Sequence, residues 1–129
     1  MTGKSIPRIG EPPKKATKTE ENLLLSDLKQ WEIIEHGAEG NGRRELHRIY
    51  EFKTFEAAFQ FMSAAATRIV SAQDHHPRWE NMYKRVEVWL STFDLEDQIS
   101  DKDLKLARSL EQLWEELGKG FPPQDLIPS

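Results

Sequence analysis

Apolar residues recur along most of the chain at spacings that switch between those of helices and those of strands. The stretch TEENLLLSDLKQW predicts a short helix that starts at Thr19, since a threonine followed by acids is typical of a helix N-terminus. WEIIEH, at 31–36, has the composition of a strand, and the glycine-rich GAEGNGRR predicts a hairpin loop. ELHRIYEFK, at 45–53, alternates between two faces and predicts the second strand of that hairpin.

A long helix is predicted after Thr54, whose side chain can cap its first turn. Residues at helical spacing predict its apolar face: Phe55, Ala58, Phe59, Met62, Ala66, Ile69 and Val70. The helix has to end before Pro77, because the residue before a proline is pushed out of the helical region. We therefore expect His75 and His76 in extended or turn geometry just beyond the helix.

The second half of the chain repeats the order of strand, strand and helix. RWENMY and RVEVWLSTF predict two strands joined by a tight turn near Lys84. Ser100 is expected to cap the last helix, with Asp103 as the capping-box partner in place of the usual Glu or Gln. Its predicted apolar stripe, which Gly118 and Gly120 end, comprises Leu104, Ala107, Leu110, Leu113, Trp114 and Leu117.

The predicted order of elements indicates an α+β fold. Both strand pairs have short connections and should be antiparallel hairpins, with the helices on one face of the sheet. The proline-rich residues 1–18 are expected to be a flexible N-terminal tail, 19–118 a single domain, and 119–129 a C-terminal tail.

Composition narrows the function classes. The net charge of −4 over 129 residues argues against a nucleic-acid binder that works through its own basic surface. The chain has no cysteine, which excludes thiolate chemistry, and no apolar run long enough to cross a bilayer. The N-terminus lacks the apolar core of a secretory signal, and its single arginine disfavours a transit peptide, so a cytoplasmic location is expected.

The stretch DHHPRW, from Asp74 to Trp79, contains two of the four histidines. Adjacent residues of an extended chain point to opposite sides, so the pair is poorly suited to chelating one metal ion. Histidine titrates near neutral pH, and Asp74 could orient a ring, so this stretch fits an acid/base site. The competing interpretation is a plain helix exit, in which the histidines are loop residues and Trp79 belongs to the core.

DHHPRWENMYKRVEVWLSTFD, followed by SDKDLKLARSLE, resembles the signature of the pterin-4a-carbinolamine dehydratase family. The matching positions include a His-His-Pro, a tryptophan, a tyrosine, a valine-rich strand, a Ser-Thr pair and an Asp-x-x-Leu-Ala helix. FEAAFQFM upstream also resembles the first long helix of that family. The resemblance spans about residues 20–117 and implies a four-stranded antiparallel sheet covered on one face by three helices.

The resemblance also implies a function, the loss of water from 4a-hydroxytetrahydropterin to give quinonoid dihydropterin. This reaction needs no metal and no organic cofactor, and it recycles the pterin of aromatic amino acid hydroxylases. By resemblance, His75 is the acid/base group and His76 contacts and orients the pterin. The other expected substrate-binding residues are Asp74, Pro77, Trp79, Ser91, Thr92, Phe93 and Asp94. Family members form dimers, or tetramers built from dimers, and neither nucleic acid nor membrane is an expected partner.

Two departures from the family pattern keep other functions open. Phe93 stands where the family usually has a third histidine, and Ser71 where it often has a glutamate. In addition, Leu95-Glu96-Asp97-Gln98 replaces a glycine-containing turn. The chain is therefore expected to be a dehydratase of reduced activity, or one selective for one isomer of the hydroxypterin. The alternative is a catalytically weakened module that binds a pterin or a protein, as some relatives bind a transcription factor through a helical surface and others are linked to molybdopterin metabolism.

Overall fold

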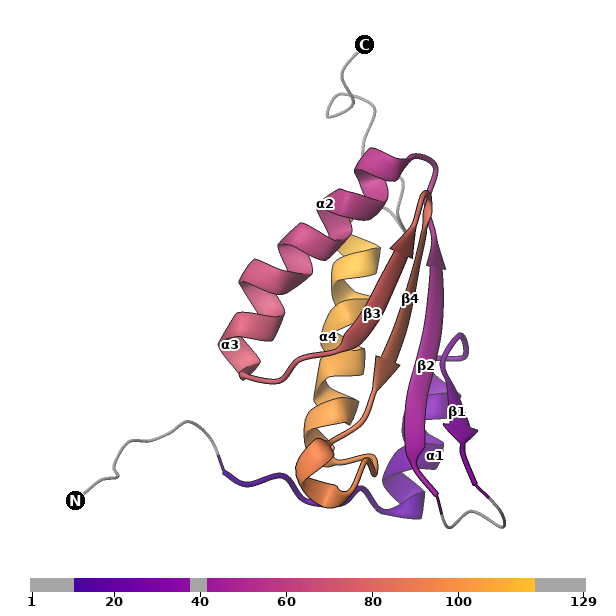
Figure 1. Cartoon of the computed structure of the whole chain (residues 1–129), viewed down its shortest axis with the longest axis vertical. Coiled ribbons are helices and arrows are strands. Elements are labelled where there is room, and N and C mark those ends of the chain that lie inside the picture. Colours follow the sequence, from indigo (N-terminus) through magenta and orange to yellow (C-terminus); the bar gives the residue numbers. More distant parts are fainter. Residues whose placement is uncertain (1–10, 38–41, 118–129) are drawn as a thin grey trace, which may run out of the picture.

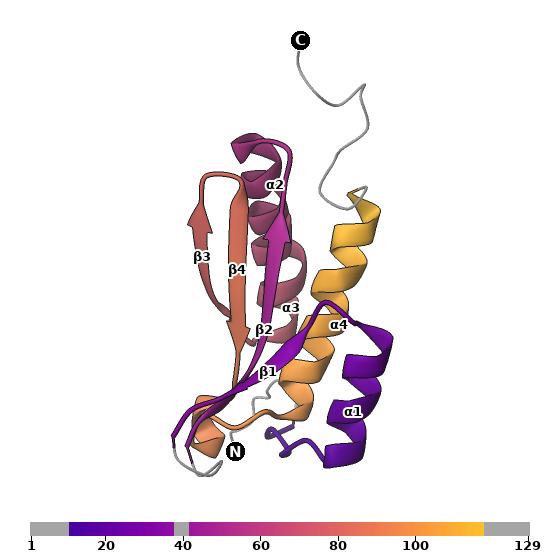
Figure 2. The ribbon, with the colours of Figure 1, turned by 90° about the vertical axis from the view of Figure 1, so that its right-hand side faces the viewer.

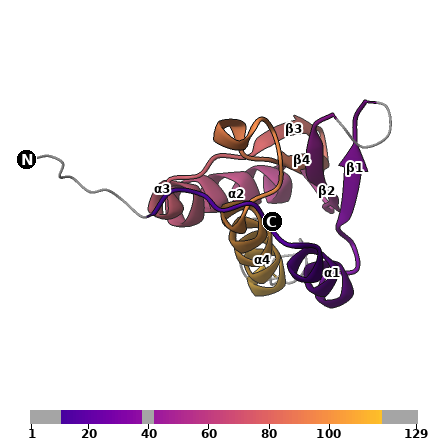
Figure 3. The same cartoon turned by 90° about the horizontal axis from the view of Figure 1, so that it is seen from below.

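The computed structural model describes residues 11–37 and 42–117 and has two layers, a sheet and the helices packed on one of its faces (Figures 1 and 3). The sheet is antiparallel in the order β1-β2-β4-β3, which confirms the α+β fold and the two hairpins. The elements in chain order are α1 Lys18–Asp27, β1 Glu32–Glu35, β2 Arg44–Glu51, α2 Phe55–Ala65, the π turn η2 Ala66–Val70, α3 Ser71–Gln73, β3 Arg78–Met82, β4 Arg85–Leu90, the 3-10 turn η3 Phe93–Leu95 and α4 Asp101–Glu116.

The two central strands supply the sheet's contribution to the core. Leu46 of β2 pairs with Leu90 of β4, and Tyr50 pairs with Val86, and all four side chains are buried under the helices. The predicted alternation of β2 is therefore confirmed, with Arg48 on the same inward face. Figure 2 shows β1 beside β2 at one edge of the sheet, with α4 and α1 on the right-hand side of the view.

Arg48 is tolerated in the core because Glu111 of α4 neutralises it. Arg48 Nη2 lies 2.9 Å from Glu111 Oε2, and the hydroxyl of Tyr50 and Nε1 of Trp31 both donate to Glu111 Oε1, at 3.0 and 2.9 Å. The guanidinium also stacks 4.0 Å from the centroid of the Tyr50 ring. Burial raises the pKa of Glu111, but the hydrogen bonds and the charge of Arg48 outweigh burial and hold this pKa below its ordinary value.

The first helix begins two residues earlier than predicted. Its N-cap is Thr17, not Thr19, because Glu20 lies three residues after Thr17 and completes a capping box with it. The segment before this cap, part of the predicted tail, lies against the start of α4 (Figure 1). Ala16 donates to the Ile99 carbonyl, and Asp101 donates to the Lys14 carbonyl, both at 2.9 Å.

The predicted apolar face of the long helix is confirmed in part, since Ala58 and Val70 are buried and Met62 and Ile69 pack against the core. Thr54 caps it as expected, but Phe55 and Phe59 are 42% and 58% exposed. The buried side chains of α2 are Ala57, Ala58, Phe61 and Ala65. The alanines let the helix approach the sheet closely, so Phe61 reaches the ring of Tyr50 at 4.7 Å between centroids. Phe55 and Phe59, 6.2 Å apart, are left on the outer face.

The last helix begins as the sequence predicts. Ser100 and Asp103 form the capping box, and Ala107, Leu110 and Leu113 are buried. Leu104, Trp114 and Leu117 pack only partly against the core, whereas Leu106, absent from the predicted stripe, is fully buried. The helix ends at Glu116, and the predicted stop signals Gly118 and Gly120, like the C-terminal tail, lie outside the described residues.

Replacing Glu111 by glutamine is expected to lower the free energy of unfolding by about 3 kcal/mol at neutral pH, because Arg48 then keeps a largely buried charge without its partner. The wild type should also lose stability in acid. The pKa of Glu111 is lower in the folded than in the unfolded chain. Its contribution is therefore complete above the unfolded pKa and is lost as the pH falls through the folded pKa. Urea unfolding between neutral pH and about pH 3 measures both effects.

The matched control is Glu116→Gln on the same helix. Glu116 forms an exposed ion pair with Arg68, which contributes at most about 1 kcal/mol. Equal losses of unfolding free energy in the two variants would contradict the role assigned to Glu111.

Candidate functional site

The candidate site lies where the chain leaves α3 and β4 and enters α4. Helix α3 ends at Gln73, and Asp74 takes a left-handed conformation with φ 52°, which aspartate tolerates better than most residues. His75 and His76 follow outside the helix, ahead of Pro77, as predicted. The DHHP stretch is therefore placed by a helix terminus on one side and by the start of β3 on the other.

The first histidine is anchored on a buried carboxylate. His75 Nε2 lies 2.6 Å from Oδ1 of Asp103, a residue with no exposed surface. A carboxylate can only accept here, so Nε2 carries the hydrogen. Within the described residues, Nδ1 of His75 has no hydrogen-bond partner. The ring is thereby held in one tautomer, with one nitrogen available to exchange a proton with a ligand.

Two further hydrogen bonds hold Asp103 itself. Its Oδ2 accepts from the Ser100 amide at 2.9 Å and from the Thr92 hydroxyl at 2.7 Å. Since Thr92 gives its only hydroxyl hydrogen to Asp103, the Ser100 hydroxyl donates to Thr92, with the two oxygens 2.5 Å apart. The capping box of α4 and the orientation of His75 therefore depend on the same carboxylate.

A cavity of about 360 Å³ opens beside this dyad. Residues from the N-terminal segment, the α3 exit, the β4 exit and α4 line it: Glu11, Pro13, Gln73, Asp74, His75, His76, Ser91, Thr92, Phe93, Asp94 and Lys102. Seven of the nine residues predicted to bind substrate are brought together in this way. Nine of the eleven lining residues are polar or charged, with one ammonium group among several carboxylates and imidazoles.

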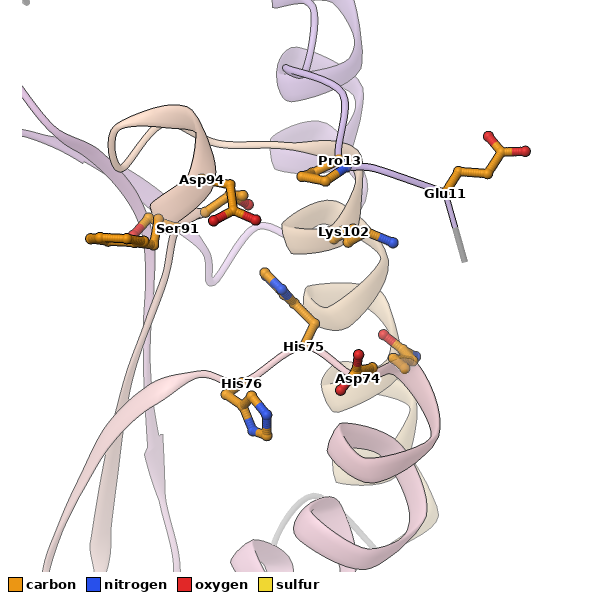
Figure 4. A pocket seen from close by; sticks show the side chains of 11 residues that line it. Glu11, Pro13, Asp74, His75, His76, Ser91, Asp94 and Lys102 are labelled. Atoms are coloured by element: carbon orange, nitrogen blue, oxygen red, sulfur yellow. The ribbon is translucent and has the colours of Figure 1, made fainter. Parts of the chain in front are cut away.

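The two adjacent histidines point in different directions (Figure 4). His75 reaches toward Asp94 on the opposite side of the cavity, whereas the ring of His76 points away from Asp94. Both residues line the cavity. This agrees with the expectation that neighbours in an extended chain face opposite sides. Lys102 extends away from Asp94, and Glu11 reaches outward from the N-terminal segment (Figure 4).

The structure separates two predicted residues from the cavity. Pro77 and Trp79 do not line it, and Trp79 packs partly buried against the hydrophobic core. Sequence reasoning placed Asp103 in the helix cap and in the family signature but gave it no role in the site, and it did not select Lys102, Gln73, Glu11 or Pro13. The missed contact between His75 and Asp103 joins residues 28 positions apart, and local patterns carry no signal for it.

The other two histidines lie on the outer face of the sheet. His36 pairs with Glu45 at 2.8 Å, and His47 lies between Glu32 and Glu87 at 2.6 and 2.7 Å. In residues 11–37 and 42–117, no group of three or more His, Asp or Glu side chains is placed to hold a metal ion. No helix in this part of the chain is long and apolar enough to span a membrane.

Comparison with known proteins identifies one family. The family model described as "Pterin 4 alpha carbinolamine dehydratase" matches residues 14–113. A Rhodopseudomonas palustris protein named "Putative pterin-4-alpha-carbinolamine dehydratase" is 36% identical over 104 residues, which cover 81% of this chain and 95% of that protein. A Synechococcus protein of the same name is 38% identical over 96 residues, 74% of this chain and 92% of its own. A crystal structure from Brucella melitensis, described as a "transcriptional coactivator/pterin dehydratase", has 35% identity and a TM-score of 0.66, and the match covers 78% of this chain and 98% of that one.

Asp103→Ala is expected to lower the free energy of unfolding by about 3 kcal/mol, because it removes the acceptor from three donors, two of them fully or almost fully buried. Guanidinium unfolding monitored by tryptophan fluorescence measures the loss. Asp101→Ala is the matched control, since Asp101 is an exposed acid in the same helical turn whose side chain accepts from the Lys14 amide. Similar losses in both variants would show that Asp103 acts only as an acid near the helix N-terminus.

Proposed function

Because the chain belongs to the pterin-4-alpha-carbinolamine dehydratase family, we propose that it removes water from a 4a-hydroxytetrahydropterin and releases quinonoid dihydropterin. The observation that carries this proposal is the His75–Asp103 pair at the wall of the cavity. After a separate two-electron reduction to the tetrahydropterin, the product would again serve the aromatic amino acid hydroxylases that oxidise the pterin.

The proposed chemistry requires a proton at the leaving hydroxyl. When the C4a–O bond breaks, hydroxide is a poor leaving group unless an acid protonates it. His75 can supply this proton through Nδ1, since Nε2 is held by Asp103. Asp103 is then a positioning residue, because it fixes the tautomer and the orientation of the imidazole ring.

The cavity suits a bicyclic ligand rich in hydrogen-bonding groups. Its volume of about 360 Å³ lies within the range of small-molecule sites. A pterin carries an amino group and ring N–H donors, which pair with carboxylates, and a carbonyl, which pairs with hydroxyl or imidazole donors. We assign Asp74, His76 and Ser91 to this recognition, and Thr92 to the support of Asp103.

Phe93 is the reason to expect reduced activity. Its side chain is 84% exposed at the mouth of the cavity, and a phenyl ring cannot transfer a proton. One acid/base group typically contributes about 10²–10⁴-fold to a rate. The chain is therefore proposed to be slower than a relative with histidine at this position.

A second candidate function is supported by the outer face of α2. Phe55 and Phe59 expose two stacked rings there, and such exposed apolar pairs commonly mark contact surfaces. We propose that this surface mediates self-association into a homodimer or homotetramer. In a catalytically weakened chain, the same surface would serve a protein partner.

The dehydration rate of freshly generated 4a-hydroxytetrahydropterin is expected to exceed the uncatalysed rate. His75→Ala should lower kcat by about 10²–10⁴-fold, and His76→Ala should mainly raise KM, because His76 is assigned to binding. His36→Gln, outside the cavity, is the control and should keep the wild-type rate. A wild-type rate equal to the uncatalysed rate would refute the dehydratase function. A melting temperature that still rises with dihydropterin concentration would then identify a pterin-binding module.

Phe59→Glu is expected to reduce the mass of the assembly in solution, because a buried carboxylate without a partner opposes association. Light scattering coupled to size exclusion measures this mass. Gln60→Glu adds the same charge at the next exposed position and is the matched control. A mass unchanged by Phe59→Glu would show that the outer face of α2 does not hold the subunits together.

A further inference from the structure

The proposed dehydration needs two proton transfers, and His75 accounts for one of them. One proton goes to the hydroxyl on C4a as it leaves, and one comes off N5 so that the C4a=N5 double bond can form. The second transfer requires a base placed away from the acid, because the two atoms of the ligand are different. Phe93 cannot be that base. The inference below rests on the proposed dehydratase function and concerns the group that replaces the missing base.

Asp94 is placed to serve as the second group. It lines the cavity from the β4 exit, and its carboxylate points toward His75 across the open space (Figure 4). His75 enters from the α3 exit, so the two groups approach a ligand from separate elements. Within the described residues, the Asp94 carboxylate has no hydrogen bond or ion pair, so it is available to a ligand.

The turn that carries Asp94 is held by its backbone. The Thr92 amide donates to the Gln98 carbonyl at 2.9 Å, and the amides of Leu95 and Asp97 both donate to the Thr92 carbonyl at 3.0 Å. None of these bonds uses the side chain at position 93 or 94. The carboxylate is therefore presented by a closed loop rather than by a free end.

The other carboxylates near the cavity are less well placed. Asp103 has no exposed surface and already accepts from three donors. Asp74 adjoins His75 in the chain and shares its wall, so it would lie near the same atoms of the ligand. Glu11 extends outward from the N-terminal segment (Figure 4).

We infer that Asp94 is the general base that accepts the N5 proton in place of a histidine at position 93. In this step the imidazolium of His75 gives its Nδ1 proton to the 4a-hydroxyl, and the C4a–O bond breaks to release water. The electron pair on N5 forms the C4a=N5 bond, and the N5 proton passes to the Asp94 carboxylate. The carboxylic acid and the neutral imidazole then exchange protons with solvent, so the step is balanced without a further reactant.

The experiment compares kcat and KM of the full chain with those of Asp94→Asn, Asp94→Glu and the double variant Phe93→His/Asp94→Asn. Asp94→Asn should lower kcat by about 10²–10⁴-fold with a much smaller change in KM. Asp94→Glu should retain part of the rate, because it keeps the carboxylate. The double variant should regain turnover, with its pH profile moved toward about pH 6.5, where histidine titrates. Asp97→Asn, on the same turn and outside the cavity, is the matched control; asparagine also tolerates the left-handed conformation found there.

The outcomes separate this inference from the proposed function. A wild-type rate equal to the uncatalysed rate refutes both. If the wild type is active, and this activity is lost in His75→Ala but unchanged in Asp94→Asn, only the role of Asp94 is refuted. A raised KM with unchanged kcat in Asp94→Asn would make Asp94 a binding contact and would equally overturn its role as base. Unfolding free energies of the variants show whether a lost rate reflects a lost fold, and turnover regained in the double variant excludes that explanation.

Discussion

The buried carboxylate of Asp103 is the interaction on which the fold and the site both depend. Taking a carboxylate out of water is costly unless donors surround it, and the donors here come from three separate parts of the chain. They are the Ser100 amide at the start of α4, the Thr92 hydroxyl after β4, and the His75 ring after α3. One group therefore caps a helix, joins two loops and sets the direction of an imidazole. The need to satisfy this carboxylate also explains why the polar residues Thr92 and Ser100 are buried.

This arrangement gives the site a rigid base although most of its residues lie outside helices and strands. The N-terminal segment is bridged to Ser100 through Lys15, and Thr92 is bridged to Gln98. Groups on such anchored loops can keep a fixed geometry while their side chains remain open to a ligand. His75 illustrates the result, since its Nε2 is held by Asp103 and its Nδ1 has no hydrogen-bond partner within the described residues.

Features that depend on neighbouring residues could be predicted from the sequence. The caps at Thr54 and Ser100, the helix stop before Pro77 and the alternation of β2 each rest on a few adjacent positions. Thr17 could have been recognised as well, because the spacing to Glu20 is that of a capping box, whereas Thr19 has Asn22 in the corresponding place.

Features that depend on distant residues could not be predicted in this way. The predicted burial of Phe55 was wrong because Phe55 and Phe61 are equally apolar, and only the position of Tyr50 on the sheet decides which ring is buried. The same holds for the contact between His75 and Asp103.

The family signature adds long-range information, but the residues that make up the signature have different surroundings in this structure. Trp79 packs against the core, whereas Asp94 faces the cavity. The path of the turn at Phe93 is set by backbone hydrogen bonds at Thr92, so the side chain at position 93 can change without moving its neighbour. The loop that presents Asp94 to the cavity can therefore be kept whichever side chain stands at position 93.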